Sequence, residues 1–335
     1  MLTNFRDFKT SSSSLEVELT SICNSRCVGC SRFKNFYFDN PHFVNGKYLD
    51  IELFLERLHQ WKNLDFILFC GNYGDPVLHP QFIELMKELR RQKGEMRILV
   101  HSNASFGAKK FWSELGSIFS SKGSYIKFSI DGSKISHEAF RRGTDWNKVI
   151  ENAEAFIAEG GNAIWQMIDF KHNHEDIENC RKLSMQMGFK RFDLRKNNYP
   201  GLDDYILASS SAVRPEVSSE LSLENLESWH SQHLRETLAQ EVACKSLERK
   251  NLYLDVHGHL WPCCWVGGLP YRPEDHLRQH FIKKFLNGSL TNLDQISIEK
   301  VSLEKILSSN VFSSIQAAID QVNFSTCKRT CGKCS

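Results

Sequence analysis

The most informative segment of this sequence is Cys23-Asn-Ser-Arg-Cys27-Val-Gly-Cys30. Its three thiols are four and three residues apart on one loop, which follows a short β-type run at 15–19. Thiols at these spacings can converge on one metal centre, and three ligands are one fewer than a closed tetrahedral site needs. On a four-iron cluster, three thiolates leave one iron open to another ligand. A zinc site that a distant histidine completes is the simpler alternative.

Short β-type runs alternate with helical runs around this segment, from residue 15 to residue 195. The strands are recognised by β-branched and aromatic residues between turn formers, and the helices by apolar residues at i, i+3, i+4 and i+7. Alternation at about 30 residues per unit predicts a parallel sheet with helical crossovers, as an incomplete barrel or a doubly wound sheet. Functional groups then belong at the carboxyl ends of the strands. The predicted strands are 15–19, 65–70, 97–101, 125–130, 163–169 and 191–195, and the predicted helices are 51–61, 81–91, 146–158 and 175–187.

The composition is that of an ordinary globular protein. The chain has 335 residues, 41% of them hydrophobic, with 42 Lys and Arg against 40 Asp and Glu. This balance gives no indication of a nucleic-acid or anionic-membrane partner, and the length suggests about two domains. There is no signal-peptide pattern and no run of roughly 18 apolar residues, so we expect a cytoplasmic protein. Its eleven cysteines are then expected to be free or to bind metal.

The alternation stops near residue 200, and the C-terminal part of the chain has a different character. Residues 201–243 contain Ser, Asp and Pro clusters before a helical run, and we expect a linker and a bridging helix there. Six of the eleven cysteines lie in 244–335, which predicts a cysteine-dependent domain. The expected domains are 1–200, 201–243 and 244–335.

The C-terminal cysteines could close a second metal site. Predicted strands at 251–256 and 260–265 form a hairpin that brings Cys263 back towards Cys244. More thiols lie on the tail, and four thiols from the hairpin and the tail can hold an iron–sulfur cluster or a zinc ion. The tail segment is Cys327-Lys-Arg-Thr-Cys331-Gly-Lys-Cys334.

The cysteine loop after the first strand resembles the hallmark of the radical S-adenosylmethionine (radical SAM) superfamily. The flanking residues Glu18-Leu-Thr-Ser-Ile-Cys are also similar to that family. The resemblance implies a partial (β/α)6 barrel and a [4Fe-4S] cluster on Cys23, Cys27 and Cys30, whose open iron chelates S-adenosylmethionine. One electron would then cleave the sulfonium, and the resulting 5′-deoxyadenosyl radical would abstract a substrate hydrogen. Gly29 departs from the family, which often has an aromatic residue at that position.

Three further segments at strand ends resemble parts of the family that contact the cofactor. The turn Cys70-Gly-Asn-Tyr-Gly-Asp-Pro is similar to its Gly-Gly-Glu-Pro turn, which offers backbone acceptors to the methionine ammonium. Segments after the third and fourth strands resemble other cofactor-facing elements. Alone, each segment is an ordinary turn or helix cap, and their register with successive strand ends gives them weight. The residues implied to bind S-adenosylmethionine are Tyr73, Gly74, Asp75, Ser102, Asn103, Ser129 and Asp131.

The C-terminal pattern is similar to the SPASM/twitch domain of radical SAM enzymes, and the shorter twitch form fits its cysteine count better. The fold then implied is a partial barrel followed by a cysteine-rich domain, a β-hairpin plus helix, with one auxiliary [4Fe-4S] cluster. Cys327 could replace either terminal ligand. The implied ligands are Cys244, Cys263, Cys331 and Cys334.

The remaining thiols and histidines are ambiguous. Cys264 follows a predicted ligand, and in a strand its side chain would point to the opposite face. It is either a small buried residue or a thiol that donates a hydrogen atom, as in radical SAM epimerases. Cys70 and Cys180 are expected in the core, whereas His257 and His259 are expected to be exposed polar residues of a turn rather than metal ligands.

The predicted function is that of a radical SAM oxidoreductase that modifies a small, sugar-like molecule or a peptide, with the auxiliary cluster as electron acceptor. An epimerase that uses Cys264 is the alternative, and a zinc-stabilised binding protein is the non-enzyme alternative. We expect no leader-peptide-binding domain before the first strand, which slightly favours a small molecule. Arg195 is a candidate for binding an anionic substrate group. The expected partner is an electron donor such as flavodoxin or ferredoxin, with no nucleic acid and no membrane.

Overall fold

The computed structural model describes most of the chain, and its residues divide into two compact units. The first unit comprises Met1–Leu19, Asp39–Leu68 and Leu223–Ser335, and the second comprises Thr20–Phe38 and Phe69–Ser222. The predicted domain boundaries at 200 and 243 stay predictions, because most of 198–240 lies outside the described residues. The described residues are 4–8, 14–34, 38–39, 46–121, 123–197, 206, 241–272, 276–321 and 324–333.

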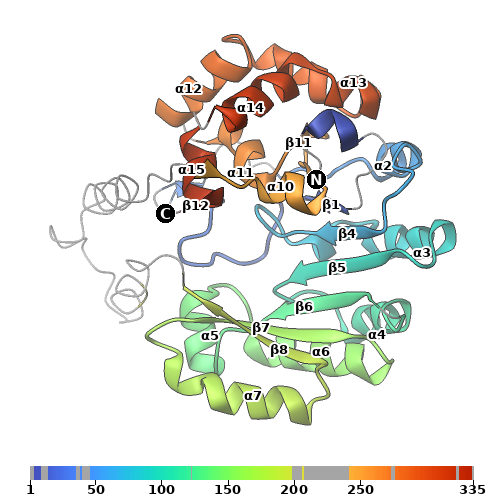
Figure 1. The fold of residues 1–335 in the computed structure, drawn as a ribbon. Helices are drawn as coiled ribbons and strands as arrows, with labels where there is room; N and C mark the ends of the chain where they lie inside the picture. Colours follow the sequence, from blue (N-terminus) through green and yellow to red (C-terminus); the bar gives the residue numbers. More distant parts are fainter. Residues whose placement is uncertain are drawn as a thin grey trace, which may run out of the picture. The chain divides into compact units, whose positions relative to one another are not determined.

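Four parallel strands and their crossover helices form most of the second unit (Figure 1). The strands lie in the order β5-β6-β7-β8, and the register pairs His101 with Lys127 and Gln166 with Asp193. These strands are β5 (Arg97–Ser102), β6 (Tyr125–Ser129), β7 (Ala163–Asp169) and β8 (Arg191–Lys196), after a short β2 (Phe33–Lys34). The helices are η2 (Pro76–Leu78), α3 (Phe82–Gln92), α4 (Lys109–Ile118), α5 (Lys134–Phe140), α6 (Trp146–Ala158), η3 (His174–Asp176) and α7 (Ile177–Gln186).

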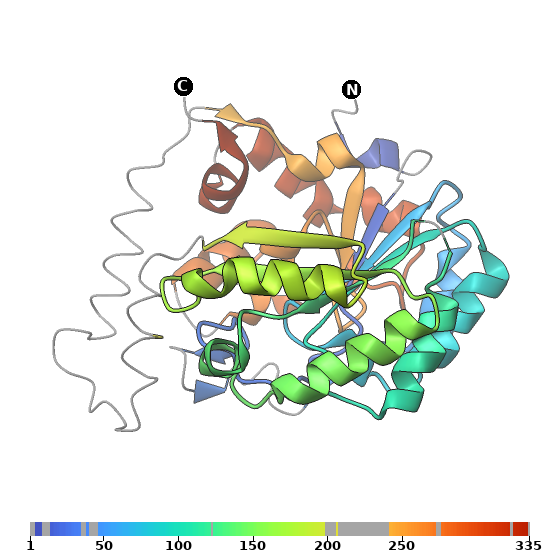
Figure 2. The same cartoon turned by 90° about the horizontal axis from the view of Figure 1, so that it is seen from below.

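The two faces of these strands differ in chemistry. On one face, the ring of Phe128 in β6 lies 5.2 Å from Trp112 of α4 and 5.5 Å from Phe156 of α6, centroid to centroid. The helices run alongside the strands in the turned view of Figure 2. Successive residues of a strand point to opposite faces, so the other face carries His101 and Lys127. The helix-covered face is therefore the core of this unit, and the opposite face holds polar groups.

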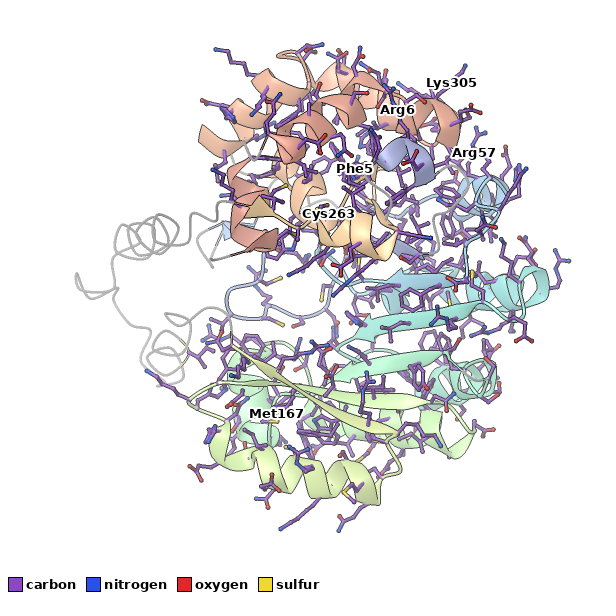
Figure 3. All side chains as sticks on the ribbon, in the orientation of Figure 1. Phe5, Arg6, Arg57, Met167, Cys263 and Lys305 are labelled. Carbon is purple, nitrogen blue, oxygen red and sulfur yellow. The ribbon has the colours of Figure 1, made fainter. Side chains whose placement is uncertain are left out.

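The first unit combines strands from both ends of the chain with most of the C-terminal helices (Figure 1). β1 pairs in parallel with β10, and β10 pairs antiparallel with β11. The N-terminal turn is anchored by Phe5, labelled in Figure 3, whose ring lies 5.7 Å from that of Phe312. The strands are β1 (Ser14–Val17), β9 (Glu241–Val242), β10 (Asn251–Leu254), β11 (Leu260–Trp261) and β12 (Gly332–Lys333), while β3 (Phe38–Asp39) and β4 (Phe66–Phe69) lie at the unit boundary. The helices are η1 (Phe5–Asp7), α2 (Ile51–Leu58), α10 (Lys245–Arg249), α11 (Cys264–Gly267), η5 (Leu269–Tyr271), α12 (His276–Phe285), η6 (Leu290–Ile296), α13 (Leu303–Leu307), α14 (Asn310–Asp320) and α15 (Ser325–Cys331).

The predicted α/β partial barrel is confirmed, since helices connect the parallel strands of the second unit and β1 pairs in parallel with β10 in the first. All six strands and all four helices predicted between 15 and 195 occur, with ends shifted by at most three residues. The strand predicted at 260–265 is wrong beyond Trp261. Pro262 has no amide hydrogen to donate to a ladder, and α11 begins at Cys264. Among the described residues, no helix is long and apolar enough to cross a lipid bilayer.

Candidate functional site

The three cysteines of the first loop are half-buried, and hydrogen-bond donors surround their sulfur atoms. Cys23 Sγ accepts from the Ser25 amide at 3.4 Å and from Asn103 Nδ2 at 3.6 Å. Cys27 Sγ lies 2.9 Å from Ser25 Oγ. Burial, followed by nearby negative charge, raises the pKa of Cys23 to about 12 and that of Cys30 to about 11. A positive metal centre would hold these thiols as thiolates, and the loop already supplies the donors that such ligands need.

A buried guanidinium reaches the same loop from the segment after α5. Arg141 Nη1 donates to Cys27 Sγ at 3.7 Å, and Arg141 Nε donates to Asp131 Oδ2 at 2.5 Å. Burial alone would lower the pKa of Arg141, but Asp131 and Cys27 raise it above its ordinary value. Arg141 therefore remains a fixed positive charge beside a cysteine sulfur. No local signal in the sequence marks this residue, because nothing in the pattern separates it from its neighbour Arg142.

Asp131 is buried and forms hydrogen bonds with Arg141, the Ile168 amide and His137. Its side chain is 0% exposed, and its other carboxylate oxygen accepts from the Ile168 amide at 2.6 Å. Its amide donates to His137 Nδ1 at 3.1 Å. The structure places the Asp131 carboxylate on Arg141, and the predicted role of Asp131 toward the cofactor stays a prediction. Its influence on the loop is therefore indirect, through the orientation of that guanidinium.

The backbone of the cysteine loop is fixed by the residues that follow α5. The amide of Arg26 donates to the carbonyl of Arg142 at 2.6 Å, and the amide of Val28 donates to the carbonyl of Phe140 at 3.0 Å. These two backbone hydrogen bonds pair the irregular cysteine loop with the segment after α5. They restrict the positions of the three thiols before any metal is bound.

Gly74 lies where the turn after β4 touches the residues that lead into the cysteine loop. A Cβ atom at Gly74 would stand 1.9 Å from the carbonyl oxygen of Thr20, so only glycine fits there. The next amide, that of Asp75, donates to the carbonyl of Ile22 at 2.8 Å. Tyr73 is half-buried in the same turn. The use of this turn as a set of backbone acceptors for the methionine ammonium stays a prediction.

Asp75 joins two of the predicted segments. Its carboxylate accepts from the Asn103 amide at 2.7 Å, from Ser102 Oγ at 3.1 Å and from the Val77 amide at 3.3 Å. Burial raises the pKa of Asp75 to about 6, although these hydrogen bonds oppose the rise. The structure thus brings Asp75, Ser102 and Asn103 together as one network. Ser129, the last residue of β6, is buried beside Gln166 and lies outside this network.

The C-terminal thiols surround one cavity of about 230 Å³. Cys244 precedes α10 and Cys263 precedes α11, while Cys327 and Cys331 lie one helical turn apart on α15. Figure 3 labels Cys263, close to α11 and α15. The amide of Ala243 donates to the carbonyl of Cys331 at 3.0 Å, which ties the two ends of this domain together. The cysteines that line the cavity are Cys244, Cys263, Cys264, Cys327 and Cys331, and Cys334 lies outside the described residues.

The thiols that line this cavity are close enough to raise one another's pKa values. Burial, with smaller contributions from Cys244 and Cys331, raises the pKa of Cys263 to about 12. Burial also raises the pKa of Cys327, again with contributions from the other three thiols. In the described part of the chain, no three His, Cys, Asp or Glu side chains converge on the position of a single metal ion.

The sequence profile of the radical SAM superfamily matches residues 17–183, from β1 to α7. The chain belongs to the radical SAM superfamily. The matched region contains the cysteine loop, the Asp75 network and Arg141. Proteins of this superfamily use a [4Fe-4S] cluster and S-adenosylmethionine, so the prediction of these two cofactors is confirmed. The auxiliary cluster and the residue assignments stay predictions.

Several radical SAM proteins have similar folds. Streptococcus suis SuiB bound to its precursor peptide SuiA has 12% identity and a TM-score of 0.57, covering 98% of this chain and 74% of that chain. Tagged anSMEcpe with bound AdoMet has 15% identity and a TM-score of 0.50, covering 96% of this chain and 100% of that chain. At these identities the likeness concerns the fold alone.

One relative is similar in sequence over a short stretch. The tungsten-containing aldehyde ferredoxin oxidoreductase cofactor-modifying protein of Pyrococcus furiosus is 33% identical over 81 residues. The alignment covers 23% of this chain and spans only 20% of that protein's length.

The other cysteines of this radical SAM protein have distinct positions. Cys264 is the first residue of α11, so the prediction that it points to the far face of a strand is wrong. It is half-buried, and burial together with Glu16 and Glu18 raises its pKa. Cys70 and Cys180 are buried, which confirms that they are core residues.

His257 and His259 are not exposed turn residues, contrary to the prediction. The ring of His257 stacks on Tyr271 at 4.6 Å between centroids, and His259 Nδ1 lies 2.7 Å from Tyr271 Oη. Buried Asp255 organises the group, since its carboxylate accepts from Tyr271 Oη and from Trp261 Nε1, both at 2.8 Å. The two histidines therefore have a packing role around a buried carboxylate.

Proposed function

We propose that this chain is a radical SAM enzyme that reductively cleaves S-adenosylmethionine and abstracts a hydrogen atom from its substrate. The observation that carries the proposal is the loop with Cys23, Cys27 and Cys30, whose sulfurs receive bonds from Asn103 and Arg141. When bound there, the cluster and S-adenosylmethionine supply the one-electron cleavage that starts hydrogen abstraction. This donor set, three thiols with polarising N–H groups, fits a cluster with one open iron.

The chain's own residues have three tasks in this proposal. Cys23, Cys27 and Cys30 bind the cluster, and the guanidinium of Arg141 offsets negative charge on the ligands. The turn of Tyr73, Gly74 and Asp75 offers backbone acceptors to the methionine ammonium. Ser102, Asn103 and Ser129 complete the cofactor site at the strand ends, and Asp131 orients Arg141.

We also propose that the C-terminal domain holds an auxiliary [4Fe-4S] cluster on four thiols. The proposed ligands are the cavity-lining thiols Cys244, Cys263, Cys327 and Cys331. Cys334, the ligand predicted from the sequence in place of Cys327, lies outside the described residues. Cys327 and Cys331 are four residues apart on α15 and so share one face of that helix. This second cluster would supply an electron acceptor, which supports two-electron oxidation of the substrate. The partner is then an electron donor such as flavodoxin or ferredoxin.

The substrate class in this proposal is a peptide or a small, sugar-like molecule. SuiB, which has a similar fold, binds a precursor peptide, and this supports a peptide as a candidate. Turnover of a panel of peptides and sugars by the reconstituted enzyme would separate the two classes.

The decisive experiment is anaerobic reconstitution followed by reaction with dithionite and S-adenosylmethionine. We expect release of 5′-deoxyadenosine by the wild-type chain and none by Cys27→Ala, which removes a cluster ligand. Cys180→Ala is the matched control, because it removes a buried thiol of α7 and should retain cleavage. Zinc without iron, together with no cofactor cleavage, would support the binding-protein alternative and overturn the proposal.

An epimerase is the second candidate function, and the position of Cys264 favours it. This thiol lies directly after Cys263 and lines the same cavity, close enough to Glu16 and Glu18 for electrostatic interaction. Epimerisation in deuterated water would place deuterium at the reacting carbon, and Cys264→Ala would stop it. Oxidation would instead give one 5′-deoxyadenosine per product without solvent hydrogen. Normal turnover of Cys264→Ala would eliminate the thiol donor.

A further inference from the structure

The face of β5–β8 opposite the helices carries a cluster of ionisable side chains that the cofactor sites do not use. His101 and Lys127 are register neighbours on β5 and β6, and Asp193 and Arg195 lie two residues apart on β8. Between them, Gln166 of β7 is in register with Asp193. In-register residues of parallel strands point to the same face, so these side chains share one surface. All of them belong to the second unit.

Positive charge exceeds negative charge in this cluster. Lys127 Nζ lies 2.9 Å from Asp193 Oδ2, and its side chain is only 7% exposed. Arg195 Nη2 lies 3.1 Å from the same oxygen, and Arg191 Nη2 lies 4.0 Å from it. One carboxylate therefore serves three cations, and one oxygen of that carboxylate receives all three contacts. Two positive charges remain without a counter-charge in this group.

His101 adds a buried nitrogen that lacks a partner. Among the described residues, nothing forms a hydrogen bond with its Nε2 atom, which is buried. Buried polar atoms are nearly always satisfied by protein, water or ligand, so this nitrogen marks a position where a polar group belongs. Burial, with smaller contributions from Lys127 and Arg195 and an opposing one from Asp193, lowers the pKa of His101 to about 3. The ring is thus neutral at pH 7 and faces two cations.

We propose that this surface binds an anionic group of the substrate, a carboxylate or a phosphate, through His101, Lys127 and Arg195. The proposal rests on the proposed function, because it describes the substrate of that enzyme. An oxyanion would accept from the Lys127 ammonium and the Arg195 guanidinium, which are the usual donors to such groups. It would also accept from His101 Nε2 and supply the missing counter-charge. Asp193 then positions the two cations rather than binding the substrate.

The experiment is a calorimetric titration of the full chain at pH 7 and fixed ionic strength, with sodium sulfate, sodium acetate and sodium chloride. Sulfate stands for a phosphate and acetate for a carboxylate, and neither changes its own protonation near pH 7. We expect one of them to bind at least ten times more tightly than chloride, which identifies the group. Arg195→Gln should weaken that binding about tenfold. Arg195 is 57% exposed, so this variant should fold, and a thermal melt checks it.

Lys196→Gln is the matched control, because it removes a positive charge from the next residue of β8, on the opposite face. It should change the affinity less than twofold. Binding of both oxyanions no tighter than chloride, or equal effects of Arg195→Gln and Lys196→Gln, overturns the inference. The proposed function is tested separately by release of 5′-deoxyadenosine from the wild-type chain. Release without anion binding refutes only the substrate site, and anion binding without release refutes only the reaction.

Discussion

Replacing Cys327 by alanine tests which thiols of the C-terminal domain hold iron. Cys327 is 8% exposed, lies one helical turn before Cys331 on α15, and lines the same cavity as Cys244 and Cys263. Alanine offers no donor atom at that corner of the cavity. We therefore expect Cys327→Ala to lose the auxiliary cluster while the rest of the chain keeps its fold.

The size of the effect follows from the separation of the two sets of thiols. Two four-iron clusters correspond to about eight iron and eight sulfide per chain. Cys327→Ala should retain about four of each, because the loop with Cys23, Cys27 and Cys30 belongs to the other unit and keeps its ligands. The variant should still release 5′-deoxyadenosine, whereas formation of an oxidised product should stop.

The assay is a count of iron and acid-labile sulfide after anaerobic reconstitution. Cys334→Ala is the matched control, because it removes another thiol from the same tail. It should keep about eight iron per chain. Cys180→Ala, a buried thiol of α7, gives the baseline for a cysteine without a metal role.

Two results would refute this reasoning. About four iron in Cys334→Ala with about eight in Cys327→Ala would restore the ligands predicted from the sequence. About eight iron in both variants would show that neither Cys327 nor Cys334 is required to hold the auxiliary cluster.

Three further predictions concern stability. Gly74→Ala places a Cβ atom 1.9 Å from a backbone oxygen, so it should lower the free energy of unfolding in urea by at least about 1–3 kcal/mol. Gly94→Ala is the control, because its Cβ atom would lie 3.6 Å from the nearest atom, the Arg90 carbonyl oxygen, and it should lower this free energy less. Equal losses in the two variants would contradict the steric argument. Asp131→Asn leaves the buried charge of Arg141 without its partner and should cost about 3–5 kcal/mol in the same assay, whereas a loss below about 1 kcal/mol would show that the ion pair is unimportant. Burial, with a smaller effect of Arg141, lowers the pKa of His137 to about 3, so the unfolded chain alone takes up this proton below pH 6.5. The free energy of unfolding should then fall by about 1.4 kcal/mol as the pH is lowered from 7.5 to 5.5. His137→Gln should lack this decrease. An unchanged pH dependence in that variant would exclude His137 as the cause of the decrease.

The strands and helices between 15 and 195 could be predicted because each has a local signal. Period-two and period-3.6 patterns of apolar residues arise within one element and need no distant partner. The parallel pairing of β1 with β10 has no such signal, because its partners are separated by more than 200 residues. The strand predicted at 260–265 failed for a local reason, since Pro262 interrupts the ladder and α11 follows.

The site could be predicted as residue types in sequence order, but not as contacts. The spacing of Cys23, Cys27 and Cys30 already indicates a shared metal centre. The sequence could not reveal that the Asp131 carboxylate accepts a hydrogen bond from Arg141, because that contact depends on the turn after α5. Likewise, Cys327 and Cys334 are equivalent in a spacing argument, and only the helical conformation of α15 places Cys327 at the cavity.

The helix α15 has only seven residues, and helices of this length are not stable alone. If it contributes two of four iron ligands, its folding and the loading of metal are one event. Exposure to oxygen would then do more than remove a cofactor. It would release the C-terminal end of the chain, which is held there by the short β9–β12 pairing, and make that end a substrate for proteases. Cluster damage and protein turnover would be linked through a single short helix.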